Sequence, residues 1–311
     1  MNTYQRGKCP PRLRRVFFCS DFPVALPLGD DVRPQHRPHR AGGDVPQQPL
    51  DGADGVIHYS YYLPSSYDGA KTYPLVVTMP GYDRMWFGAD SAGTNLSWNG
   101  VQAWTKLDTE VIVVSAQLTD WGDTSARQAN ELAEYMIENF SVDTSRVYAA
   151  GYSAGGETMS RAVAMRPDLY AAYIHGGSQW DGAFDTVAEN RVAVYIFMAE
   201  HDEYYGSQKA RDAYAGLHDA YAAEGLTEAE IDALLKLEIP DDAYFNDRGI
   251  YNYHGGGSPG PACLFHEDRN KFIVAEFPGA CKCPLPGQAC FFPPPGAYSG
   301  RLQLCEWRAF P

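Results

Sequence analysis

The segment that most constrains this chain is Gly151-Tyr152-Ser153-Ala154-Gly155-Gly156, a G-x-S-x-G sequence. A strand-like run at residues 146–150 precedes it, and a helix-like run at residues 157–166 follows it. A strand, this motif and a helix are typical of a nucleophile elbow, where a sharp turn lifts the serine hydroxyl above the sheet. The pattern predicts that Ser153 is a catalytic nucleophile. It also predicts that the backbone N–H of Ala154 faces an anion site at the helix N-terminus.

A serine nucleophile needs a base, and the base needs a carboxylate that orients it. Residues 191–200 read as a buried strand, and Asp202 follows directly after it. Because functional groups gather at the carboxyl ends of parallel strands, we predict that Asp202 is the acid. Glu200 and Glu203 lie at the same strand end and are the alternatives.

The base must come from the eight histidines of the chain. Only His254 and His266 remain as candidates. The other six histidines lie in the Pro/Arg-rich N-terminal segment, in an early strand, on a helix face, or at strand ends in the wrong chain order or too close to Asp202. His254 precedes three glycines, Gly255-Gly256-Gly257, and a loop of this kind can carry an imidazole over the nucleophile. We therefore predict His254 as the base, with His266 as the alternative.

An oxyanion hole needs a second N–H donor, from the loop after an early strand. Residues 73–80 form an apolar strand-like run, and Gly81 and Tyr82 follow it. The backbone N–H of Tyr82 is the predicted donor, together with that of Ala154. Many esterases have a His-Gly pair here, and this chain has Pro80-Gly81. The change is tolerable because the donor belongs to the backbone.

Three aromatic residues are predicted on the rim of the site, where they would bind an acyl or aryl group. Trp86 follows the oxyanion loop, Trp180 follows a strand end, and Tyr204 follows the acid. Ordinary packing of large side chains is the alternative.

Together these motifs resemble the alpha/beta-hydrolase family that contains polyhydroxybutyrate depolymerase-like, feruloyl esterase-like and prolyl oligopeptidase-like proteins. The resemblance covers residues 56–257, about two thirds of the chain, and implies an ester hydrolase with Ser153, Asp202 and His254 as its triad. Asp202 matches the Gly-x-x-Asp turn common in this superfamily, although Ala199 replaces its glycine. Many members are exported from bacterial cells, which implies a secreted or cell-envelope location. This chain has no clear signal peptide.

Strands alternate with helices along residues 56–254, so we predict an α/β fold with a doubly wound, mostly parallel sheet. Residues 57–63 alternate in polarity and are predicted to be its antiparallel edge strand. Residues 207–224 and 227–236 have helical spacing and form a predicted helical insertion between the acid and the histidine.

The ends of the chain differ in composition from its middle. We expect a poorly ordered flank at residues 1–50, a hydrolase domain at 51–266 and a Pro/Cys-rich flank at 267–311. One hypothesis is that one or both flanks are out-of-frame translations of an ordinary hydrolase gene. All seven cysteines lie before residue 20 or after residue 262, and their number and spacing indicate no disulfide framework and no zinc ribbon. No metal and no cofactor are predicted.

Charge and hydropathy narrow the possible partners. The net charge of −14 makes nucleic acid an unsuitable partner. No apolar run reaches the roughly 20 residues that a membrane helix needs. The oligomeric state is not indicated. The family resemblance implies hydrolysis of acyl or aryl esters, related to plant cell walls or polyesters. A prolyl oligopeptidase-like peptidase and a non-catalytic binding relative with a disrupted C-terminus are the alternatives.

Overall fold

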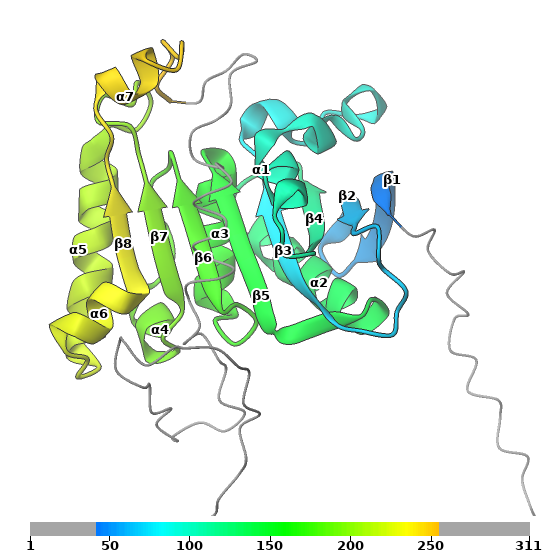
Figure 1. Cartoon of the computed structure of the whole chain (residues 1–311), viewed down its shortest axis with the longest axis horizontal. Coiled ribbons are helices and arrows are strands. Elements are labelled where there is room, and N and C mark those ends of the chain that lie inside the picture. Colours follow the sequence, from blue (N-terminus) through cyan, green and yellow to red (C-terminus); the bar gives the residue numbers. More distant parts are fainter. Residues whose placement is uncertain (1–41, 255–311) are drawn as a thin grey trace, which may run out of the picture. The chain divides into compact units, whose positions relative to one another are not determined.

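The computed structural model describes residues 42–254, which form one eight-stranded sheet with helices against it (Figure 1). The order of the strands across the sheet is β1-β2-β4-β3-β5-β6-β7-β8. Their bounds are Gly43–Gly52 (β1), Gly55–Leu63 (β2), Tyr73–Met79 (β3), Ile112–Gln117 (β4), Val142–Tyr152 (β5), Ala172–Gly176 (β6), Ala193–Phe197 (β7) and Leu235–Glu238 (β8).

The sheet is doubly wound and mostly parallel, as predicted. β2 pairs antiparallel with β1 and β4, and every pairing from β4 to β8 is parallel. From β3 the chain builds outward in one direction through β4 and in the other through β5 to β8. The carboxyl ends of β3 and β5 therefore flank the point where the winding reverses, which is where open sheets of this kind bind ligands.

Four helices pack in succession along the sheet, each in contact with the next. They are α2 (Asp123–Asn139), α3 (Ala154–Met165), α4 (Phe184–Glu189) and α5 (Ser207–Ala223). In α2, Leu132, Ala133 and Met136 are fully buried, as the helical spacing of its apolar residues predicts. The interior of the sheet is dominated by aliphatic side chains, with every residue of β3 and β4 buried.

A segment of short helices connects β3 to β4 above the carboxyl edge of the sheet (Figure 1). It contains η1 (Tyr82–Arg84), η2 (Ala89–Ser91), η3 (Thr94–Ser97), α1 (Asn99–Gln102) and η4 (Trp104–Lys106). The fully buried side chain of Gln117, at the end of β4, binds this segment. Its amide oxygen accepts from the N–H of Gly93, and its amide nitrogen donates to the carbonyls of Arg84 and Ser91.

The prediction that residues 57–63 form the edge strand is wrong, because β1 pairs with β2 and lies outside it. The sheet thus begins at Gly43, within the flank that was expected to end at residue 50. β1 contains Pro46 and Pro49, which disfavour a strand in general but are tolerated at a sheet edge. Its register shifts between Val45 and Gln48, and this bulge contains Pro46, whereas Pro49 lies in register opposite His58.

Three helices lie between the predicted acid and histidine where two were expected, and the second of them ends earlier than its spacing suggested. α6 is Glu228–Leu234, and the capping box at its start, Thr227 with Glu230, is present. Leu235 begins β8, which pairs with β7. α7 (Asp242–Asn246) follows. α5 is therefore part of the connection that leads from β7 to β8.

Several predictions concern residues outside 42–254, including His266, all seven cysteines and the C-terminal flank. Within the described range, no helix has the length and apolar character needed to cross a membrane. No group of three or more His, Cys, Asp or Glu residues in this range is placed to hold a metal ion.

Candidate active site

Ser153 lies at the turn between β5 and α3, with φ of 55° and ψ of −127°. A non-glycine residue rarely adopts a positive φ, so this turn is strained. Neighbouring glycines allow it: a Cβ on Gly155 would lie 2.1 Å from the carbonyl oxygen of Met79, and one on Gly151 would lie 2.4 Å from that of Gly155. Only glycine at these two positions lets α3 approach β3 and β5 this closely. The predicted nucleophile elbow is present.

The imidazole of His254 lies between the serine and the acid. Its Nε2 is 3.0 Å from Oγ of Ser153, and its Nδ1 is 2.8 Å from Oδ2 of Asp202. An ionised carboxylate can only accept, so Nδ1–H donates to Asp202 and Nε2 can accept the proton of Ser153. These three side chains come from three separate loops at the carboxyl edge of the sheet.

Asp202 is held in place by three donors. Its Oδ1 accepts from the backbone N–H of Tyr204 at 2.9 Å and of Tyr205 at 2.7 Å, while Oδ2 accepts from His254. Burial would raise the pKa of this carboxyl, but the hydrogen bonds from His254 and Tyr205 outweigh it and hold the pKa below its usual value. The carboxylate therefore stays ionised next to the imidazole.

Glu203, an alternative for the acid, binds the backbone of the histidine loop. Its two carboxylate oxygens accept from the N–H groups of Tyr253 at 2.9 Å and His254 at 2.6 Å. Glu200, the other alternative, uses its backbone N–H to bind the carbonyl of Pro240. From the sequence, Glu203 was predicted only as an alternative to Asp202 for the acid. Its position beside Asp202 was the one available signal, since a backbone partner leaves no trace in the sequence.

The two predicted oxyanion donors lie beside the serine. Tyr82 and Ala154 are the first residues of η1 and α3, so neither N–H has an acceptor within its own helix. A Cβ on Gly81 would lie 3.4 Å from Cβ of Ser153, which places the residue before Tyr82 in contact distance of the serine.

The three predicted rim aromatics have different surroundings. The ring of Tyr204 is 4.7 Å from that of His254. The indole of Trp86 stacks on His58 of β2, with 3.5 Å between ring centroids. Trp180 packs near Phe184 at 5.7 Å. Of the three rings, that of Tyr204 is the one that lies next to the imidazole of His254.

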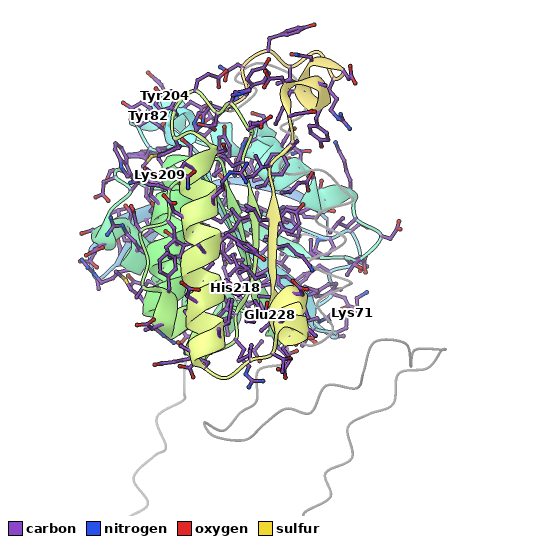
Figure 2. All side chains as sticks on the ribbon, turned by 90° about the vertical axis from the view of Figure 1, so that its left-hand side faces the viewer. Lys71, Tyr82, Tyr204, Lys209, His218 and Glu228 are labelled. Atoms are coloured by element: carbon purple, nitrogen blue, oxygen red, sulfur yellow. The ribbon has the colours of Figure 1, made fainter. Side chains whose placement is uncertain are left out.

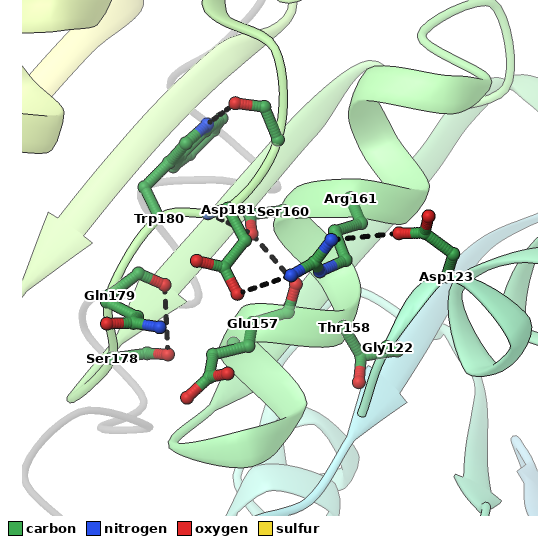
Figure 3. Close-up of polar contacts among 12 residues, drawn as sticks. Gly122, Asp123, Glu157, Thr158, Ser160, Arg161, Ser178, Gln179, Trp180 and Asp181 are labelled. Atoms are coloured by element: carbon green, nitrogen blue, oxygen red, sulfur yellow. Dashed lines mark hydrogen bonds and ion pairs between the residues drawn. The ribbon is translucent and has the colours of Figure 1, made fainter. Parts of the chain in front are cut away.

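Trp180 belongs to a loop fixed by polar contacts to α3 (Figure 3). Its indole N–H donates to the carbonyl of Gly182, and the N–H of Asp181 donates to the hydroxyl of Ser160. Arg161 joins the carboxylates of Asp123 and Asp181. These contacts explain the packed position of the Trp180 side chain.

The chain matches a model of the prolyl oligopeptidase family over residues 115–235, which include Ser153 and Asp202. Its fold matches that of a thermostable esterase with a TM-score of 0.58 at 17% identity, covering 73% of this chain and 61% of the esterase. The chain has the alpha/beta-hydrolase fold. A second structure, a feruloyl esterase module from Clostridium thermocellum, matches with a TM-score of 0.51 at 16% identity over 82% of this chain and 93% of the module.

Among curated proteins, this chain is similar to two cutinases over 127 residues. It is 32% identical to Cutinase 2 of Thermobifida cellulosilytica, over 39% of this chain and 45% of the cutinase. It is also 32% identical to Cutinase cut1 of Thermobifida fusca, over 39% of this chain and 37% of that protein. The chain therefore spans less than half the length of these relatives.

Proposed function

We propose that the protein is a serine hydrolase that cleaves carboxylic esters. The observation that carries this proposal is the chain of contacts from Ser153 through His254 to Asp202, at 3.0 Å and 2.8 Å. Such a chain turns a weakly nucleophilic hydroxyl into one that can attack a carbonyl carbon. The likeness to proteins named cutinase and to esterases of known structure supports an ester as the substrate.

The proposed reaction has two halves. In the first, Oγ of Ser153 attacks the carbonyl carbon while Nε2 of His254 takes its proton. The N–H groups of Tyr82 and Ala154 donate to the oxyanion. The C–O bond to the alcohol then breaks, and His254 returns the proton to the leaving oxygen, which leaves the acyl group on Ser153. In the second half, water attacks this acyl group and gives its proton to His254, and the free acid leaves as Ser153 regains a proton.

Asp202 and Glu203 have separate roles in this proposal. Asp202 stabilises the imidazolium that forms in each half, because its ionised oxygen is 2.8 Å from Nδ1. Glu203 holds the backbone from which the imidazole extends. The esters we propose as substrates are plant cell-wall or polyester esters, because the curated relatives are named cutinases and one structural neighbour is a feruloyl esterase module.

The test compares hydrolysis of p-nitrophenyl butyrate by the full chain, by Ser153→Ala and by Ser145→Ala. Ser145 lies on the same strand as the elbow, far from its carboxyl end, and is the matched control. We expect Ser153→Ala to lose roughly 10³-fold or more in kcat, since removing a triad serine leaves only residual catalysis. Ser145→Ala should keep the rate of the parent. Equal rates for all three proteins would contradict the proposal.

A peptidase is the second candidate, because the family model that matches residues 115–235 is that of the prolyl oligopeptidases. The same triad chemistry serves both reactions. Proline-containing peptides are therefore assayed beside the ester. Cleavage of the peptide without cleavage of the ester would favour the peptidase.

A further inference from the structure

Exposed aromatic side chains gather at the carboxyl edge of the sheet. Within residues 42–254, large apolar side chains are markedly exposed at seven positions, and five of these are aromatic. All five lie on segments that follow the carboxyl ends of β3, β4, β7 and β8: Tyr82, Phe87, Trp121, Tyr204 and Tyr251. Tyr82 and Tyr204 are labelled at the same end of the molecule in Figure 2. Clustered exposed apolar groups mark binding surfaces, whereas single scattered ones do not.

Three of these side chains, Tyr82, Phe87 and Trp121, contact one another and are called the aromatic trio below. The ring of Tyr82 is 5.0 Å from that of Phe87 and 5.9 Å from that of Trp121, both in edge-to-face geometry. Their exposed fractions are 59%, 56% and 40%. The three rings thus form a continuous apolar surface that no described residue covers.

The backbone under the trio is fixed by hydrogen bonds. The N–H of Phe87 donates to the hydroxyl of Ser91, whose carbonyl is bound by Gln117. Next to Trp121, the carboxylate of Asp120 accepts from the N–H of Gly122 and the hydroxyl of Ser125. A surface held in this way has little conformational entropy left to lose when a ligand binds.

The trio includes a residue of the proposed oxyanion hole. Tyr82 supplies a proposed oxyanion donor, and a Cβ on the preceding Gly81 would lie 3.4 Å from Cβ of Ser153. Phe87 and Trp121 contact the ring of Tyr82 and lie on the segments after β3 and β4. Two exposed carboxylates, of Asp83 and Asp90, lie between members of the trio in the sequence. Asp83 forms an ion pair with Arg84, so these three charged side chains carry a net negative charge, which disfavours an anionic ligand.

We propose that Tyr82, Phe87 and Trp121 form a subsite for an uncharged planar ring of the substrate, on the β3–β4 side of the ester that Ser153 attacks. Flat rings bind to aromatic side chains by stacking and edge-to-face contacts, which is the geometry that the trio already has. The subsite selects ring-bearing esters long enough to reach from Ser153 to Trp121. This inference rests on the proposed ester hydrolase function.

The test uses ester pairs that differ only in a terminal ring. Methyl 4-phenylbutyrate and methyl butyrate place the ring on the acyl side, while 4-phenylbutyl acetate and butyl acetate place it on the alcohol side. For each pair, the ratio of kcat/KM with and without the ring is measured for the parent, Phe87→Ala and Trp121→Ala. In at least one series we expect the parent to have a higher kcat/KM for the ester that carries the ring. In each variant the ratio of kcat/KM with and without the ring should fall about 2- to 10-fold, the range that one aromatic contact supplies.

Two further variants control for general damage. Met165→Ala removes a side chain that is 40% exposed, like Trp121, but that lies at the end of α3 away from the catalytic edge. It should keep the ring preference of the parent. Trp121→Phe should restore most of the preference that Trp121→Ala loses. A parent with no ring preference in either series, or a preference unchanged in both alanine variants, would overturn the subsite.

A binding measurement separates failure of the subsite from failure of the proposed function. Saturation-transfer NMR of 4-phenylbutyl acetate is recorded with Ser153→Ala and with the double variant Ser153→Ala/Trp121→Ala, neither of which needs turnover. Transfer to the phenyl protons should be strong in the first and weak in the second. If the parent hydrolyses no ester but this difference is present, the subsite stands and the proposed function fails. Equal transfer in both proteins overturns the subsite.

Discussion

The hydroxyl of Tyr205 donates a 2.6 Å hydrogen bond to the carboxylate of Glu157, which joins the turn that carries Asp202 to the helix that follows Ser153. Glu157 lies in the first turn of α3. The N–H of Tyr205 also donates to Asp202, and its ring is 5.6 Å from that of His254. One tyrosine therefore contacts Asp202, His254 and helix α3.

Tyr205→Phe removes this link and keeps the ring. Because a hydrogen bond to a charged acceptor contributes about 1.5–3 kcal/mol, we expect urea unfolding to show a loss of that order, with kcat falling and KM little changed. Glu157→Gln keeps an acceptor and should retain most of the kcat. Tyr204→Phe is the matched control for stability, since Tyr204 also donates its N–H to Asp202 but its side chain is 81% exposed. Equal stability of Tyr205→Phe and Tyr204→Phe would contradict this role.

Gln117 holds the segment that carries Tyr82. Its side chain is fully buried and binds three backbone groups, at Arg84, Ser91 and Gly93. Gln117→Leu would leave these groups without their partner, so we expect about 2–4 kcal/mol of destabilisation in urea and a fall in kcat as the oxyanion loop shifts.

Gln128→Leu provides the comparison for Gln117→Leu. Gln128 is 6% exposed and makes a single 3.3 Å bond to the carbonyl of Asp54, away from the site. The kcat of Gln128→Leu should match that of the parent. If the two leucine variants have the same stability and the same kcat, Gln117 does not have the anchoring role described here.

The buried imidazole of His175 makes the free energy of unfolding depend on pH. It lies fully buried at the end of β6, and burial lowers its pKa from 6.5 to about 4. The unfolded chain then binds a proton that the folded protein does not, so stability falls as the pH drops from 6.5 towards 4. The loss at the end of that window is on the order of 3 kcal/mol.

The measurement is the free energy of unfolding in urea at pH 7 and pH 4.5. His175→Gln should be less stable than the parent at pH 7 but should lose less on acidification, because it has no imidazole to protonate. Asp202 affects stability at lower pH. Its pKa is lower in the folded protein than in the unfolded chain, so its contribution to stability is present above the unfolded pKa of 3.8 and is lost as the pH falls below that value. An identical loss in the parent and in His175→Gln would show that the buried imidazole is not the cause.

The elbow, the mostly parallel sheet and the grouping of Ser153, Asp202 and His254 could be predicted from the sequence, because each depends on a local pattern. Ser153 lies between Gly151 and Gly155, where a side chain would prevent the close contact of strand and helix. Asp202 follows a continuous apolar strand. β1 was missed because Pro46 and Pro49 argue against a strand, and only its position at the edge permits them.

Other features depend on tertiary contacts that leave no local pattern. β8 has four residues and continues directly from α6, so its Leu235 read as the end of that helix. Glu203 and Gln117 act on backbone groups, which any residue could supply. The packing of Trp86 on His58 joins segments that the sequence does not place side by side.

The most direct test of the central claim is to label the full chain with a fluorophosphonate and locate the adduct by peptide mass spectrometry. Such a reagent reacts with a serine whose hydroxyl a neighbouring base activates. We predict a single adduct, on Ser153, with labelling greatly slowed in His254→Ala and with loss of p-nitrophenyl ester hydrolysis in step with labelling. An adduct on a different residue, or full ester hydrolysis by protein labelled on Ser153, would contradict the account.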